Sequence, residues 1–252
     1  MRFTTLLASL LTVVSCLSAQ WIKPQPTGVP RTPDGKINLS GPVPRTADGK
    51  PDISGMWFSS SKYNANLAAD LKDGAPFTPS MKTLFAERTA NQSKDDPDAN
   101  CLPDGVPRIT AAGTLPHRIV QTPGMVIMLY ERGLFRQIYT DGRTLQKDPN
   151  PTWMGYSTGK WDGDTFVVTT TGFNDKTWLD DAGHGHSQQL TVTERYRRTD
   201  FGHMDLQITI EDPVNYTRPW TVIQPLRLDP NGDLLEYVCL ENEKDQKHIF
   251  AK

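Results

Sequence analysis

Glu194 is a carboxylate on a segment that otherwise has the pattern of a half-buried strand. Between Gln189 and Arg198 the side chains alternate, so Glu194 shares one face with Leu190, Val192 and Tyr196. A carboxylate on a buried face costs several kcal/mol unless it is paired, neutralised or bound to a metal. Two interpretations stay open. Glu194 is a general base or metal ligand in a cavity, or it forms an internal ion pair with an inward arginine, for which Arg136 is the obvious candidate.

A second group of chemically useful side chains lies in the long segment 172–187, between two expected strands. His184 and His186 are two residues apart, and this spacing on an extended backbone places both imidazoles on one face, as zinc or copper sites require. Glu194 and His203 could complete such a set. The same two histidines could instead act as acid, base or substrate-orienting groups, or simply bond to neighbouring acids. All three interpretations remain open.

Ligand-binding candidates come from the aromatic residues near the expected turns, which are Trp57, Trp153, Tyr156, Trp161, Trp178 and Trp220. A subset at a cavity mouth would suit an apolar, aromatic or sugar-like ligand. We assign Tyr156 and Trp178 to the pocket wall, Arg136 to an anionic group of the ligand, and Asp180 to its polar contacts. The sequence has none of the motifs of serine hydrolases, nucleotide enzymes, thiol oxidoreductases or zincins. We therefore expect no organic cofactor, while a divalent metal, zinc or copper, stays open.

These side chains must be positioned by a mainly β structure. Strong turn sequences such as Asp162-Gly163 separate the apolar segments. The expected strands are 118–121, 125–131, 134–139, 155–161, 165–171, 189–198, 203–211, 220–228 and 234–240. Short connections predict antiparallel neighbours throughout, in a meander that closes into a lipocalin-like barrel of about 8–10 strands. A helical segment at 62–92, with Thr78 as the N-cap of one helix, is expected to pack against one end.

The N-terminus predicts export to the periplasm or the medium. Residues 1–19 read as a signal peptide, with a positive charge followed by a short apolar run. Cleavage after Ala19 would release a soluble chain, whereas lipidation of Cys16 would give a lipoprotein. In an oxidising compartment, Cys101 and Cys239 are expected to form a disulfide, although two separate buried thiols are the alternative.

The rest of the chain divides into an arm and one large domain. The arm, residues 20–55, is rich in Pro and Gly and contains a duplication, in which 29–36 recurs fourteen residues later as 43–50. The domain, residues 56–252, is the barrel. Net charge is −2 with both signs interspersed, so nucleic acid is not an expected partner. A membrane contact is expected only through a lipid on Cys16.

Several blocks carry a resemblance to known proteins. They are Arg45-Thr-Ala-Asp-Gly-Lys-Pro-Asp-Ile-Ser-Gly-Met-Trp57, Cys101-Leu-Pro-Asp-Gly-Val-Pro-Arg108, Pro151-Thr-Trp-Met-Gly-Tyr-Ser157 and Gly172-Phe-Asn-Asp-Lys-Thr-Trp-Leu-Asp180. Over nearly the whole mature chain they resemble a large family of secreted bacterial proteins, abundant in acidobacteria and some proteobacteria. That resemblance implies export and no particular activity. Gly55-Met56-Trp57 also resembles the lipocalin Gly-x-Trp signature, which implies an antiparallel barrel with an internal cavity.

Two functions follow from these observations. The first is an exported barrel that binds a small apolar, aromatic or sugar-like molecule. The alternative is a lyase, isomerase or hydrolase, cofactor-independent or metal-assisted, that uses His184, His186 and Glu194 in the barrel pocket.

Overall fold

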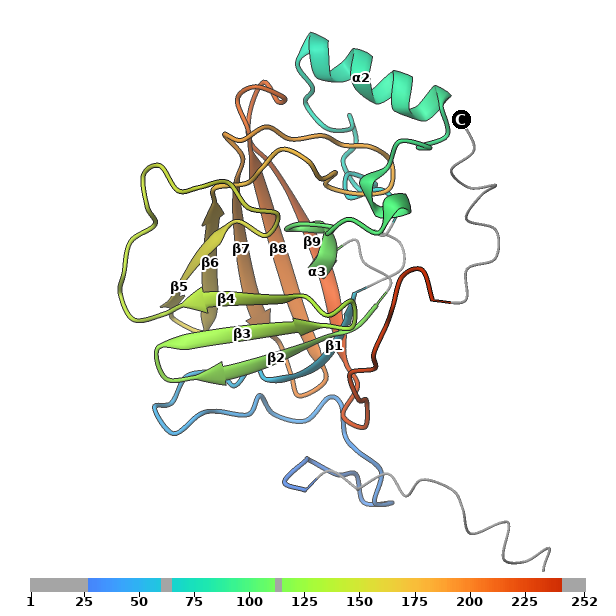
Figure 1. Cartoon of the computed structure of the whole chain (residues 1–252). Helices are drawn as coiled ribbons and strands as arrows, with labels where there is room; N and C mark the ends of the chain where they lie inside the picture. Colours follow the sequence, from blue (N-terminus) through green and yellow to red (C-terminus); the bar gives the residue numbers. More distant parts are fainter. Residues whose placement is uncertain (1–26, 60–64, 112–114, 242–252) are drawn as a thin grey trace, which may run out of the picture.

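The computed structural model describes residues 27–59, 65–111 and 115–241. The predicted signal peptide and Cys16 lie outside these residues. Nine strands form one closed barrel in chain order (Figure 1). They are β1 (Gly55–Ser59), β2 (His117–Thr122), β3 (Met125–Tyr130), β4 (Phe135–Tyr139), β5 (Tyr156–Asp162), β6 (Thr165–Thr171), β7 (Thr191–Arg198), β8 (His203–Glu211) and β9 (Trp220–Leu228). The predicted mainly β barrel is therefore confirmed.

The prediction of antiparallel neighbours throughout is wrong at one place, because β4 and β5 pair in parallel. Strands that alternate in direction around a closed ring must be even in number, so nine strands require a parallel pair. Residues 140–155 make this parallel pairing possible, since they carry the chain from the end of β4 back to the other end of the barrel before β5 begins. The crossover contains no helix, and for that reason the sequence pattern did not reveal it.

The strand expected at 234–240 is also not formed. β1 pairs with both β2 and β9 and so closes the barrel, which leaves no free edge for another strand. Residues 229–241 instead form a strap along the outside, drawn in red in Figure 1. Two backbone amides of this strap, those of Leu235 and Tyr237, donate hydrogen bonds to Glu131. The predicted disulfide between Cys101 and Cys239 is confirmed and anchors the end of the strap.

Side chains that face the barrel interior are large and buried, as the alternation of β7, β8 and β9 predicts. Trp57, Phe166 and Tyr196 are among the largest fully buried residues. Gly159 on β5 makes room for one of these rings, since a Cβ there would lie 2.4 Å from Cζ of Phe166. The core is thus built from interlocking aromatic and branched side chains.

The two ends of the barrel are covered differently (Figure 1). One end, which we call the capped end, carries α2 (Pro79–Ala90), η2 (Pro97–Asn100), α3 (Arg108–Ala111) and the loop 172–190. The expected N-cap is confirmed, because the Thr78 side chain accepts a hydrogen bond from the amide of Met81. The helical segment is shorter than predicted, since residues 65–78 form turns rather than helix. Within the described residues no helix is long and apolar enough to cross a membrane.

The other end is covered by the arm, and both copies of its duplication fold into the same turn. The guanidinium of Arg31 donates to the carbonyl of Gly35 at 2.7 Å, and that of Arg45 donates to the carbonyl of Gly49 at 2.9 Å. Arg45 also makes a bidentate contact to Asp164 in the turn between β5 and β6. The second copy therefore helps to hold the arm against the barrel, as do the backbone hydrogen bonds from Phe201 to Gly41 and from Gly202 to Leu39.

Candidate functional site

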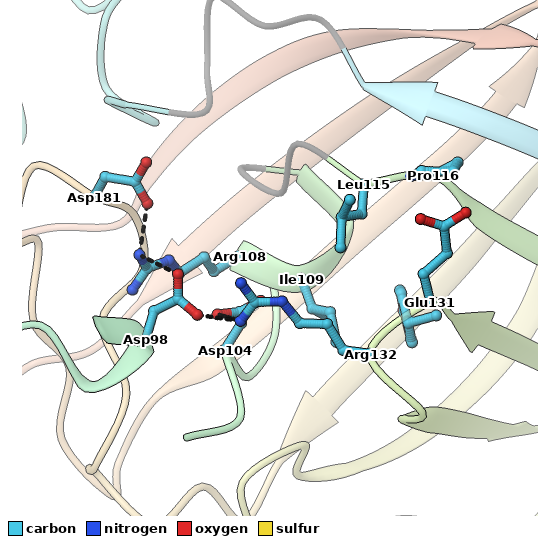
Figure 2. Close-up of a pocket in the computed structure, with 10 residues that line it drawn as sticks. Asp98, Asp104, Arg108, Ile109, Leu115, Pro116, Glu131, Arg132 and Asp181 are labelled. Carbon is cyan, nitrogen blue, oxygen red and sulfur yellow. Dashed lines mark hydrogen bonds and ion pairs between the residues drawn. The ribbon is translucent and has the colours of Figure 1, made fainter. Parts of the chain in front are cut away.

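A charged cavity opens at the capped end of the barrel, and we call it the mouth pocket. Its volume is about 120 Å³. Figure 2 shows its lining, which comes from η2, α3, the turn after β3, the residues before β2, and the loop 172–190. The lining residues are Asp98, Asp104, Arg108, Ile109, Leu115, Pro116, Tyr130, Glu131, Arg132 and Asp181.

Arg108 is the more deeply buried of the two arginines in the mouth pocket. Its guanidinium makes a bidentate contact to Asp96, with both N···O distances 2.8 Å. It also donates to Asp181 at 2.5 Å, and Oδ2 of Asp98 lies 3.9 Å away. A planar guanidinium suits this geometry because its fork matches a carboxylate. Arg108 therefore joins η2, α3 and the loop 172–190 into one wall.

Arg132 occupies the opposite side of the pocket, in the turn between β3 and β4. It donates to both Asp98 and Asp104, with 3.2 Å to Oδ1 of Asp104. Its guanidinium carbon lies 5.4 Å from the ring centroid of Tyr237 in the strap. The pocket therefore presents carboxylate oxygens and guanidinium N–H groups side by side.

The electrostatic environment shifts the pKa values of the two aspartates that share Arg132 in opposite directions. Burial raises the pKa of Asp104 to about 7, and the neighbouring Asp98 charge adds to this effect while Arg132 opposes it. Burial also tends to raise the pKa of Asp98. The hydrogen bond and charge of Arg132, with the charge of Arg108, outweigh this effect and hold the pKa below its ordinary value. One carboxyl of the pair thus titrates near neutral pH beside a partner whose pKa is lowered.

The local sequence explains how Asp104 and Arg108 reach the pocket. Gly105 has φ +70°, and a Cβ at this position would lie 2.7 Å from Oγ1 of Thr177, so the tight turn requires glycine. The turn leads directly into α3, whose first residue is Arg108. Nearby, the disulfide ties Cys101 to the strap. The sequence interpretation assigned no chemistry to this block. Its detectable signal was the run of aspartates at 95, 96, 98 and 104 before a single arginine.

His184 and Asp180, both predicted site residues, are in direct contact elsewhere at the capped end. The Nδ1 atom of His184 lies 2.7 Å from Oδ2 of Asp180, and that carboxylate also accepts the amide of Leu67 at 2.7 Å. The imidazole packs against the rings of Phe77 and Phe85, with centroids 5.2 and 4.7 Å away. Asp180 and His184 therefore hold the loop 172–190 against the segment that leads into α2.

The three histidines considered as metal ligands are not brought together. His186 Nε2 lies 2.6 Å from Oγ1 of Thr177, its Nδ1 lies 3.1 Å from the Ser187 carbonyl, and burial lowers its pKa. His203 begins β8 at the arm end, where Nδ1 lies 2.8 Å from Asp200. In the part of the chain that the structure describes, no group of three or more His, Cys, Asp or Glu residues could hold a metal ion.

Glu194 and Arg136 form the internal ion pair that was one of the two interpretations of the buried carboxylate. Both residues face the barrel interior and are buried. Tyr196 donates its hydroxyl to Glu194 at 2.8 Å, while Arg136 also donates to Ser157 at 3.0 Å and Thr170 at 2.7 Å. Every charged oxygen and most guanidinium N–H groups are thus used inside the protein, which leaves Arg136 poorly placed to hold an anionic ligand.

Tyr156 and Trp178, the expected pocket walls, do not line the mouth pocket. The Tyr156 hydroxyl donates to the Asn150 carbonyl at 3.1 Å. Trp178 is buried beneath Arg88, whose guanidinium carbon lies 4.2 Å from the ring centroid. The predicted site residues are therefore spread over separate clusters, and the charged cavity is formed by residues that sequence reasoning had not selected.

The chain matches no protein-family model, no curated protein and no solved structure.

Proposed function

We propose that this protein is an exported β-barrel that binds a small polar, sugar-like molecule in the mouth pocket. The observation that carries this proposal is the lining, in which Asp98 and Asp104 alternate with the guanidinium groups of Arg108 and Arg132. A hydroxyl group donates to a carboxylate and accepts from a guanidinium, so a molecule rich in hydroxyls satisfies both kinds of group at once. The volume of about 120 Å³ equals that of roughly four water molecules, at about 30 Å³ each.

Two features favour a sugar-like ligand over an apolar or aromatic one. The mouth pocket is lined mostly by charged side chains, and an apolar ligand would strip them of water without replacing its hydrogen bonds. The barrel interior, where an apolar ligand would lie in a lipocalin-like protein, contains the buried rings of Trp57, Phe166 and Tyr196.

The binding function is also favoured over catalysis by His184, His186 and Glu194. These residues belong to three separate hydrogen-bond networks, with Asp180, Thr177 and Arg136 as their respective partners. Acid–base catalysis needs its groups within reach of one substrate. The enzymatic alternative is therefore better supported at Asp104, whose pKa of about 7 suits proton transfer at neutral pH.

Thermal unfolding with a panel of glucose, galactose, mannose, xylose and glucuronate tests the binding proposal. A ligand that binds only the folded protein raises its Tm, so at least one sugar is expected to do so. Arg132→Gln should abolish the rise, because it removes the donor between Asp98 and Asp104. The matched control is Arg195→Gln, which alters an exposed arginine paired with Asp162 on the outer face of the barrel. A wild-type Tm that no sugar moves would exclude this ligand class.

The enzymatic alternative has a separate test, in which hydrolysis of nitrophenyl glycosides of the same sugars is followed as a function of pH. If Asp104 transfers the proton, the rate should change around pH 7, and Asp104→Asn should remove that change. The absence of turnover with every glycoside would leave binding as the function of the pocket.

A further inference from the structure

A second cavity adjoins the mouth pocket on the side of the strap, and we call it the strap cleft. Its volume is about 90 Å³. Arg132 lines both cavities, so they meet at this side chain. Its guanidinium reaches Asp98 and Asp104 in the mouth pocket (Figure 2). The same guanidinium lies 5.4 Å from the ring centroid of Tyr237, which lines the strap cleft. A ligand in the mouth pocket would therefore lie beside the strap cleft.

The lining of the strap cleft differs in chemistry from that of the mouth pocket. It includes Leu102, Leu134, Tyr237 and the disulfide that anchors the strap. Among the described residues, Arg132 is the one charged member of this lining. Leu102 and Tyr237 are 41% and 39% exposed, so both present apolar surface to solvent. A single exposed hydrophobic residue needs no explanation, but two that line one cavity form a surface that a ligand can cover.

The strap holds Tyr237 in place although the strap has no regular secondary structure. The amide of Tyr237 donates to the carbonyl of Glu131 at 3.0 Å, and the amide of Leu235 donates to the Glu131 carboxylate at 3.0 Å. Two residues after Tyr237, Cys239 is joined to Cys101. Glu131 itself lines the mouth pocket. The backbone that carries the ring is thus fixed next to that pocket, which reduces the entropy lost when a ligand packs against the ring.

A second sugar ring fits the chemistry of the strap cleft. A sugar ring carries C–H groups on its faces and hydroxyl groups around its edge, and the negative face of an aromatic ring attracts C–H groups. Tyr237 can therefore pack against a sugar face, while Arg132 donates to oxygens of the ligand where the two cavities meet. The volumes of the mouth pocket and the strap cleft equal about four and about three water molecules. Each cavity thus accepts one edge or face of a ring rather than a whole sugar.

We propose that the strap cleft is a second sugar subsite, so that the ligand is an oligosaccharide whose neighbouring rings occupy the mouth pocket and the strap cleft. This proposal rests on the proposed function, because it extends the same site and narrows the ligand class. Asp98 and Asp104 bind one ring, Tyr237 packs against the next ring, and Arg132 contacts both.

Binding of matched single sugars and disaccharides tests the strap cleft. Glucose is compared with maltose and cellobiose, mannose with mannobiose, and xylose with xylobiose, first by Tm and then by titration calorimetry. At least one disaccharide should bind more tightly than its single unit. Tyr237→Ala should weaken binding of that disaccharide by about three- to tenfold, as the loss of one aromatic contact implies. It should leave the affinity for the single unit unchanged, and Tyr237→Phe, which keeps the ring face, should bind as the wild type does.

Phe58→Ala is the matched control, because Phe58 is also an aromatic residue, 37% exposed, and lines neither cavity. It lies on β1 opposite Arg227 of β9, so its removal should change no sugar affinity. Leu102→Ala removes a different part of the cleft wall and should also weaken binding of the disaccharide. Without sugar, the Tyr237→Ala variant should keep the wild-type Tm within about 2 °C, since substitutions of exposed side chains have small effects.

The outcomes separate this proposal from the proposed function. If Arg132→Gln abolishes sugar binding while Tyr237→Ala and Leu102→Ala keep the full disaccharide affinity, the mouth pocket binds sugar alone and the second subsite is overturned. Disaccharides that bind no more tightly than their single units would overturn it as well. So would an equal loss of both affinities in Tyr237→Ala, because the ring would then only support the mouth pocket. If no single sugar or disaccharide changes the wild-type Tm, the proposed function fails and the second subsite fails with it.

Discussion

The surroundings of Asp104 disfavour the charged form of its carboxyl group. It is buried in the wall of the mouth pocket, next to the ionised Asp98, and its pKa rises from 3.8 to about 7. Such a group binds its proton more tightly in the folded state than in the unfolded state. Its contribution to stability is therefore complete below about pH 4 and is lost as the pH rises towards 7.

Replacing Asp104 with Asn should remove this pH dependence. Between pH 4 and 7 the free energy of unfolding of the wild type should fall relative to the variant, by up to about 1.4 kcal/mol per pH unit. Urea denaturation at several pH values measures the difference. Asp162→Asn, on an exposed carboxylate paired with Arg195, serves as the control and should run parallel to the wild type. Parallel curves for Asp104→Asn would contradict the raised pKa.

The internal pair of Arg136 and Glu194 makes a different prediction, because both partners are charged and buried. Glu194→Gln leaves the guanidinium without its counter-charge, and a buried pair broken in this way loses about 3–5 kcal/mol of stability. Combining Glu194→Gln with Arg136→Met removes the unpaired charge. The double variant should therefore lose less stability than the sum of the two single variants, which denaturant unfolding can measure.

A purely additive double-mutant cycle would mean that the two side chains do not interact. Asp162→Asn is again the control, because it breaks a solvent-exposed ion pair with Arg195. Solvent screens this pair, so the substitution should change the free energy of unfolding only slightly.

At the scale of elements, the strap 229–241 and the loop that carries Asp98 and Asp104 depend on each other. The disulfide between Cys101 and Cys239 joins them across a sequence separation of 138 residues. The strap also contributes two backbone amides to Glu131, which adjoins Arg132. The loop and the turn that form the two sides of the mouth pocket are thereby fixed to one outer segment.

The double variant Cys101→Ser/Cys239→Ser should lose about 4–5 kcal/mol of stability on the chain-entropy model, because the closed loop is long. It should also bind sugar more weakly, since Asp98 and Asp104 lose their anchor. Equilibrium unfolding measures the first effect and the sugar-induced Tm shift the second. Wild-type protein treated with a reductant is the matched comparison. Unchanged stability after both treatments would show that the strap is held by its other contacts.

At the scale of the whole molecule, the disulfide and the predicted signal peptide point to the same compartment. A disulfide persists in oxidising surroundings such as the periplasm, and the described barrel contains one. The arm and the cap cover opposite ends of the barrel (Figure 1). A lipid on Cys16 would therefore tether the protein through the arm and leave the mouth pocket at the far end.

We expect processing after Ala19, which gives a soluble protein beginning at Gln20. The intact mass of protein recovered from the periplasmic fraction measures this directly. Cys16→Ala should leave both the mass and the fraction unchanged. A lipid-modified mass, or release from the membrane only in Cys16→Ala, would establish the lipoprotein instead.

The sequence by itself determined the barrel, most of its strands, the disulfide and the inward direction of Glu194. These features follow from local rules, namely alternation with a period of two, turn residues such as Asp162-Gly163, and cysteine pairing in a chain with a predicted signal peptide. The alternation and turn rules depend on residues that are close in the chain. The cysteine rule chooses among few possible pairs. The sequence pattern alone therefore predicts these features.

Only the tertiary structure decided the parallel pairing of β4 and β5, the outer position of the strap, and the mouth pocket. Strand number and closure are properties of the whole ring, so no local segment encodes them. The pocket joins residues that lie far apart in the sequence. The pKa of Asp104 depends on burial and on a neighbouring charge that only folding provides. His184, His186 and Glu194 are close in the sequence, yet the loop and the strand direct them to three different sets of partners.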